Sequence, residues 1–173
     1  MQQKQLDITL VTPTAAMSAE AYGGRAKCLQ RLVRLDLPVP QTVALSFKAV
    51  HEIASGIPAD VNAILGYFDH SDLICVRPSS QSADWGGPGA VLNIGMNKAR
   101  YALLCDTLGA EAAAILYLSF VQAYSIHVAR LDADIFDHIK GQDHAALEQA
   151  LRAYEEEAEE VFSQERDAQL TQV

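Results

Sequence analysis

Short apolar stretches in the first hundred residues predict β-strands. Residues 6–11 alternate between apolar and polar side chains, which is the period of a strand with one buried face. Residues 42–45, 73–77 and 91–94 are short apolar runs bounded by turn-forming residues. We expect a strand at each of these four places, and we expect the strand at 73–77 to be buried.

Apolar residues three or four positions apart predict helices between these strands. A first helix begins at Gly23 and Gly24 and ends before Pro38, because proline lacks an amide hydrogen and disfavours helix in the residue before it. Ser46 is the expected N-cap of a helix at 47–54, and a short helix follows at 60–67. The apolar residues expected on the buried face of the first helix are Cys28, Leu29, Leu32, Val33 and Leu35.

A helical pattern continues through most of the second half of the chain. Residues 97–128 form a long helical stretch with one break near Gly109, and Asp143 is the expected cap of a final helix. The apolar face of this final helix contains Leu147, Leu151, Tyr154, Ala158, Val161 and Phe162. We therefore expect an α+β fold: residues 1–96 form a small mixed sheet with flanking helices, and residues 97–173 form a helical C-terminal part.

The charge is concentrated in the last quarter of the sequence. The chain has 22 acidic and 13 basic residues, and residues 131–173 carry its entire net charge of -9. Five glutamates fall within residues 155–160, and we expect them to form a solvated helix face rather than a metal site. Such a chain lacks the basic surface of a nucleic-acid-binding protein, so no nucleic-acid partner is expected.

The apolar segments and the cysteines indicate a cytoplasmic protein. No apolar run reaches the roughly 18 residues of a membrane span, and the N-terminus lacks the apolar stretch of a signal peptide. Cys28, Cys75 and Cys105 are widely spaced and form no C-x-x-C pair. We expect no membrane partner, and we expect the three cysteines to be buried and reduced.

Two segments have the residue types of a phosphate-binding site. Gly23 and Gly24 precede Arg25 at the start of a helix, where backbone amides, the helix dipole and a cation can meet an anion. Arg77 ends the strand at 73–77 and is followed by a loop rich in glycine and serine. Its planar guanidinium matches phosphate oxygens, but it could equally pair with a carboxylate such as that of Asp84.

The order of these motifs resembles the N-terminal nucleotide-binding domain of the pyruvate phosphate dikinase and phosphoenolpyruvate synthase family. The matching blocks are GGRA at 23–26, LDLPVP at 35–40, CVR at 75–77 and VLNIGMN at 91–97. The resemblance covers about the first 140 residues and implies a partial ATP-grasp-like domain that binds ATP with magnesium. It implies a nucleotide site made by Gly23, Gly24, Arg25, Arg77, Ser79 and Gly86, in which the two arginines contact the phosphates.

Several positions depart from the family pattern. Arg25 replaces a lysine, which keeps the charge but changes its geometry, and Pro78 replaces the serine that follows the family's arginine. The phosphohistidine motif of the type G-G-x-T-S-H is absent from this sequence. The resemblance implies that the magnesium ligands belong to a second half of the domain that this chain lacks.

Two functions therefore remain open at the level of sequence. One is the ATP-binding portion of a dikinase-like phosphotransferase, which would not turn over alone and would need its missing second half as a partner. The other is a free-standing, non-catalytic relative that binds a nucleotide, another anion or a protein. A partial ATP-grasp domain would expose apolar surface, so self-association into a homo-oligomer is also expected.

Overall fold

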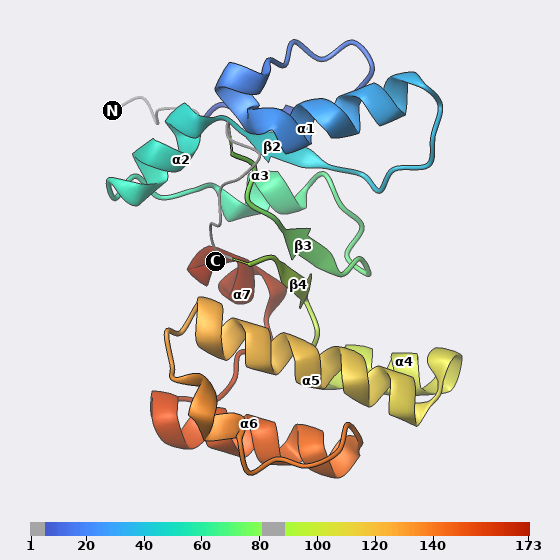
Figure 1. Cartoon of the computed structure of the whole chain (residues 1–173), viewed down its shortest axis with the longest axis vertical. Coiled ribbons are helices and arrows are strands. Elements are labelled where there is room, and N and C mark those ends of the chain that lie inside the picture. The colour runs from blue at the N-terminus through green and yellow to red at the C-terminus, as the bar shows by residue number, and fades with distance from the viewer. Residues whose placement is uncertain (1–5, 81–88) are drawn as a thin grey trace. The chain divides into compact units, whose positions relative to one another are not determined.

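The computed structural model describes residues 6–80 and 89–173, drawn in colour in Figure 1. These residues belong to two compact units. Residues 6–70 and 78–80 lie in the first, which we call the N-terminal unit. Residues 71–77 and 89–173 lie in the second, the C-terminal unit.

The N-terminal unit packs one long helix against a two-stranded sheet. Its elements are β1 (Ile8–Leu10), α1 (Ala19–Arg34), β2 (Val43–Leu45), α2 (Phe47–Ala54) and α3 (Val61–Leu65). Strands β1 and β2 pair antiparallel, with Ile8 opposite Leu45. The buried core between α1 and this sheet contains Val11, Met17, Tyr22, Ala26 and Ala44.

The buried face of α1 differs from the predicted one. The buried positions are Tyr22, Ala26 and Gln30, each four residues apart, together with Gly23. The Gln30 amide donates to the carbonyls of Thr12 (3.1 Å) and Ala15 (2.7 Å) in the loop before α1, which is why a polar residue lies there. Cys28 falls between these positions and is exposed, and Leu35 lies past the helix end with 69% exposure, so placing them on the buried face was wrong.

Side-chain caps begin both short helices, and the Ser46 cap was predicted. The Ser46 hydroxyl accepts from the Ala49 amide at 3.1 Å, which begins α2 at the expected residue. The Asp60 carboxylate accepts from the Ala63 amide at 2.9 Å and begins α3. These two side chains satisfy amides that have no partner inside their helices, so local sequence is enough to fix both helix starts.

The C-terminal unit is mainly helical. It contains β3 (Ile74–Val76), β4 (Val91–Ile94), α4 (Lys98–Leu108), α5 (Ala110–His127), the 3-10 turn η1 (Ala133–Phe136), α6 (His144–Ala158) and α7 (Arg166–Gln172). The helix break at Gly109 is confirmed: its φ of 89° separates α4 from α5. The Asp143 cap of α6 is also confirmed, since its carboxylate accepts from the Ala146 amide at 3.0 Å. The turn η1 and helix α7 were not predicted.

The expected mixed sheet is wrong. The described strands form two separate antiparallel pairs, β1 with β2 and β3 with β4. Each strand has only three or four residues, and the two pairs belong to different compact units. Strand β3 is also only partly buried, because its side chains alternate: Ile74 is buried and Cys75 is exposed.

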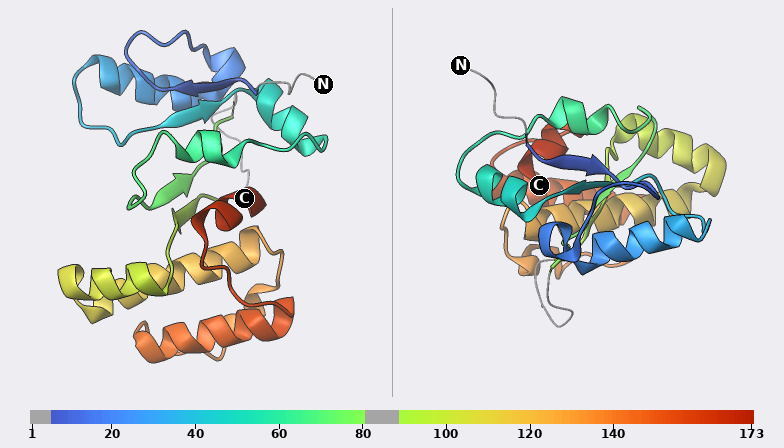
Figure 2. Two further views of the ribbon diagram at one scale, coloured as in Figure 1. Left: turned by 180° about the vertical axis from the view of Figure 1, so that it is seen from behind. Right: turned by 90° about the horizontal axis from the view of Figure 1, so that it is seen from above.

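Helix α5 forms the centre of the C-terminal unit, where it contacts α4, α6 and β4 (Figure 2). Its apolar residues cover most of its circumference, as expected of a buried helix. Phe162 lies at the centre of an aromatic cluster with ring-centroid distances of 5.0 Å to Tyr154 and 5.3 Å to Tyr124. Val161 is exposed, because α6 ends at Ala158 and the chain turns at Glu159, whose φ is 55°.

The prediction that the three cysteines are buried is wrong. All three thiols are free, and Cys28 and Cys75 are exposed while Cys105 is half-buried. In the described part of the chain, no helix has the length and apolar character to cross a membrane.

Candidate functional site

The start of α1 is built from two helical pieces that meet at Gly23. Ser18 caps a first turn by accepting from the Ala21 amide at 3.2 Å. Gly23 then takes φ 83° and ψ 163°, a conformation that interrupts the helix and is open essentially only to glycine. Helical geometry resumes at Gly24 and continues to Arg34. The amides of residues 24–26 therefore form the start of a new helical segment, with its partial positive charge.

The Pro78–Ser80 segment lies directly on this helix start. The Gly24 amide donates to the Ser80 carbonyl at 3.0 Å, and the Ala26 amide approaches the Ser79 hydroxyl at 3.3 Å. The Arg25 guanidinium donates to the Pro78 carbonyl at 2.7 Å. Two segments more than fifty residues apart in the sequence thus meet through three donors and three oxygen atoms.

Gly23 permits this close approach because it has no side chain. A Cβ atom at Gly23 would lie 2.3 Å from the Ser79 Oγ atom and 2.7 Å from the Ser79 carbonyl oxygen. At Gly24, by contrast, the nearest atom to a Cβ would be the Ser80 carbonyl oxygen at 3.8 Å, an ordinary contact. The first glycine is therefore required by the packing of the two backbones, and the second is not.

A tyrosine anchors the helix start to the sheet. The Tyr22 hydroxyl donates to the Asp7 carboxylate and contacts the Thr9 hydroxyl, both at 2.8 Å. Burial raises the pKa of Tyr22 above its ordinary value, and the Asp7 carboxylate raises this pKa further. The phenol therefore stays protonated across the physiological range, and its hydrogen bond to Asp7 is retained.

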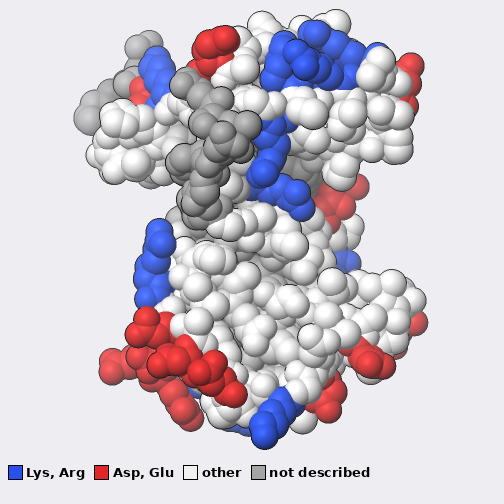
Figure 3. Space-filling model, in the orientation of Figure 1, with Lys and Arg blue, Asp and Glu red and all other residues white. Residues whose placement is uncertain are grey.

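The helix α1 is the most basic element of the N-terminal unit. It carries Arg25, Lys27, Arg31 and Arg34 against the single acid Glu20, and basic side chains gather over it in Figure 3. Arg25 bonds a neutral carbonyl, and no ion pair joins it to a carboxylate of residues 6–80 or 89–173. Lys27 is committed elsewhere, because its ammonium donates to Met17 and Gln30 at 2.7 and 2.9 Å. Among the described residues, the Arg25 charge is therefore not neutralised by a carboxylate.

Four of the six predicted site residues come together, namely Gly23, Gly24, Arg25 and Ser79. Arg77 belongs to the C-terminal unit, where its Nε lies 3.2 Å from the Cys75 Sγ atom. Its role in the site therefore stays a prediction. Gly86, like Asp84, lies outside the described residues.

The residues of this site fit a phosphate group only if the Pro78–Ser80 segment gives up its bonds. The amides of Gly24 and Ala26 and the Arg25 guanidinium are suitable donors, but each already binds an oxygen of that segment. The described residues offer no comparable site for the magnesium ion that the resemblance implies. Among residues 6–80 and 89–173, no three His, Cys, Asp or Glu side chains are grouped so as to hold a metal ion.

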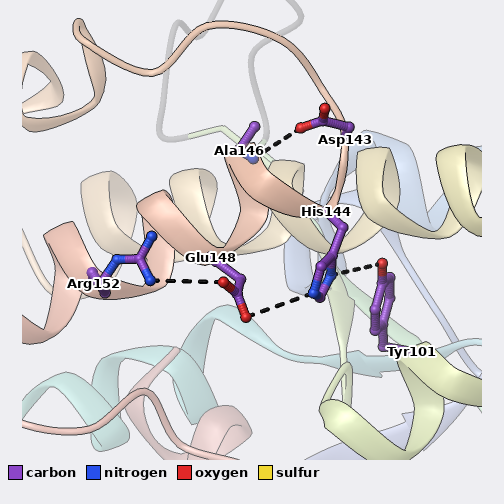
Figure 4. Close-up of polar contacts among 6 residues, drawn as sticks. All are labelled: Tyr101, Asp143, His144, Ala146, Glu148 and Arg152. Atoms are coloured by element: carbon purple, nitrogen blue, oxygen red, sulfur yellow. Dashed lines mark hydrogen bonds and ion pairs between the residues drawn. The ribbon is translucent and has the colours of Figure 1, made fainter.

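A second polar cluster lies in the C-terminal unit between α4 and α6 (Figure 4). The Tyr101 hydroxyl lies 3.1 Å from His144 Nδ1, and His144 Nε2 lies 3.6 Å from the Glu148 carboxylate. Arg152 extends the row at 3.7 Å from Glu148. The side chains of His144 and Glu148 are more than half exposed, so this row resembles a surface network that holds α4 to α6.

No protein-family model matches the chain, and no curated protein sequence is significantly similar to it. The likeness to the dikinase family therefore rests on the order of the sequence motifs alone.

Sequence reasoning missed the oxygen atoms that occupy the helix start. Pro78 and Ser80 contribute backbone carbonyls, which carry no sequence signature. One signal was present: small residues stand on both sides of the contact, with two glycines at 23–24 and two serines at 79–80. Small residues on facing segments permit backbones to approach closely.

Proposed function

We propose that the N-terminal unit is a nucleotide-binding module whose phosphate site is the start of α1 together with the Pro78–Ser80 segment. One observation carries the proposal: the two segments that the sequence marks as phosphate-binding meet in the structure through the Gly24, Arg25 and Ala26 donors. The resemblance to the dikinase family supports ATP as the ligand class. The proposal ends at binding, because the described residues offer no magnesium ligands.

The present contacts indicate how a phosphate would be held. The Ser79 hydroxyl, the Ser80 carbonyl and the Pro78 carbonyl place three oxygen atoms against the donors of α1. Phosphate oxygens of ATP would take these places, and the negative charge would gain from the helix dipole and from Arg25. The ligand therefore competes with an internal segment, which favours weak binding.

Isothermal titration calorimetry tests this proposal with ATP as the ligand, with and without magnesium. We expect the Arg25→Ala variant to bind at least about tenfold more weakly, since a charge-assisted bond contributes roughly 1.5–3 kcal/mol. Arg31→Ala is the matched control, because Arg31 is an exposed arginine of the same helix, outside the site. Inorganic triphosphate in a parallel titration separates recognition of the phosphates from recognition of the whole nucleotide.

Two outcomes would contradict the proposal. The first is no detectable heat of binding with the unmodified chain at millimolar ATP. The second is equal loss of affinity in the Arg25→Ala and Arg31→Ala variants, which would indicate attraction to the general charge of α1 instead of a defined site.

A further inference from the structure

Helix α4 of the C-terminal unit has an outer face that no other described element of that unit covers. None of its eleven residues is buried, although seven of them are apolar. Its inner side chains hold it in place: the Tyr101 ring lies 6.0 Å from that of Tyr117 on α5 and stacks at 5.7 Å on His144 of α6. The opposite side is exposed, and Leu103 is 56% exposed there.

The exposed residues of this outer face form one stripe. Ala99, Ala102, Leu103 and Asp106 follow the spacing of three and four residues that places side chains on one side of a helix. Two alanines flank the leucine, so a second helix could approach closely and bury it. An 11-residue helix of this kind gains little from its own backbone bonds, and packing supplies most of its stability.

The charges on α4 are opposite to those that an isolated helix favours. Lys98 is the first residue of the helix and Asp106 lies in its last turn, whereas the helix dipole favours acids at the start and bases at the end. An antiparallel second copy of α4, crossing at Ala102 and Leu103, would bring each Lys98 beside the other chain's Asp106. Both unfavourable charges would then have partners, which selects this orientation over a parallel one.

We propose that the outer face of α4 binds the same face of a second copy of this chain, in an antiparallel pair about a two-fold axis. Leu103 and Ala102 form the centre of the contact, and two Lys98–Asp106 pairs flank it. The helix is only about 16 Å long, so the interface is small and the dimer is expected to be weak.

Sedimentation equilibrium of the full chain tests this pairing. We expect the average mass to rise from 18.8 kDa toward twice that value as the protein concentration increases. Leu103→Lys should weaken the dimer at least about tenfold, because it removes the central apolar contact and places two like charges at the two-fold axis. Val161→Lys is the control, since Val161 is an even more exposed apolar residue outside α4.

A charge-swap series gives the sharpest result. Lys98→Asp alone or Asp106→Lys alone should weaken the dimer, and the double variant should restore it, because only the double variant regains opposite charges across the axis. Circular dichroism checks that each variant is folded. If Leu103→Lys does not fold, the charge-swap variants alone test the pairing. A chain that stays monomeric at millimolar concentration overturns the proposal. A dimer that is indifferent to both Leu103→Lys and the charge series overturns it as well.

Discussion

Alanine at position 23 tests the close approach between α1 and the Pro78–Ser80 segment. The substituted Cβ would lie within 2.7 Å of three atoms of Ser79, two of which belong to its backbone. Gly23 also has a φ of 83° and a ψ of 163°, which cost a residue with a side chain roughly 1–3 kcal/mol. Overpacking adds roughly 1–3 kcal/mol, so Gly23→Ala should lower the free energy of unfolding by about 2–6 kcal/mol.

Urea denaturation followed by circular dichroism at 222 nm measures this loss. Gly24→Ala is the matched control, because Gly24 has an ordinary helical φ and a Cβ there would meet no atom closer than 3.8 Å. That variant should be neutral or up to about 1 kcal/mol more stable, as alanine replaces glycine in a helix.

A second substitution separates the side chain of Ser79 from its backbone. Ser79→Ala should not rescue Gly23→Ala, because the Ser79 carbonyl oxygen is also within 2.7 Å of the new Cβ. The reasoning is refuted if Gly23→Ala is as stable as the unmodified chain, or if Gly24→Ala loses as much stability as Gly23→Ala.

Three further predictions concern the supporting structure. Ser46→Ala should lower the free energy of unfolding by about 1 kcal/mol, because α2 loses its N-cap. The control Ser55→Ala changes an exposed serine and should alter this free energy by less than about 0.5 kcal/mol. Equal effects of the two substitutions would contradict the capping role of Ser46. Gln169→Leu should cost at least about 3 kcal/mol in the same urea assay, because the buried amide bonds Gly95, Met96 and Ser163, whereas Gln172→Leu at the exposed end of α7 should be nearly neutral. Burial and the Glu160 carboxylate raise the pKa of Tyr154, so above about pH 10 the unfolded chain loses this proton while the native state keeps it, and stability falls. Above this pH, Tyr154→Phe should make the fall in the free energy of unfolding less steep by up to about 1.4 kcal/mol per pH unit. An unchanged dependence on pH would contradict the role of Tyr154.

The elements that sequence predicted well are those determined by local chemistry. Ser46 and Asp143 each cap a helix at the expected place, and Gly109 breaks the long helical stretch, because each acts on a backbone a few residues away. Strand pairing depends on distant residues, and the separate antiparallel pairs could not be derived from four short apolar runs.

Features that depend on distant residues were also missed on the buried face of α1 and in the candidate site. The inner face of α1 includes the polar Gln30, because the carbonyls of Thr12 and Ala15 need a donor there, and apolar periodicity alone pointed to Cys28. The donors at Gly24 and Arg25 followed from the glycine pair and the adjacent cation. Their present partners at Pro78 and Ser80 are carbonyl groups more than fifty residues away, which no local pattern marks.

The phosphate site at the start of α1 is tested most directly by the backbone amide signals of Gly24 and Ala26 in a two-dimensional ¹H–¹⁵N NMR spectrum. Both amides now bind oxygens of Ser80 and Ser79, so a phosphate that replaces those oxygens must change their chemical shifts. We predict saturable shifts at Gly24, Arg25 and Ala26 on titration with ATP, and none at Arg31. Unchanged signals at residues 24–26, with ATP present at millimolar concentration, would contradict the account.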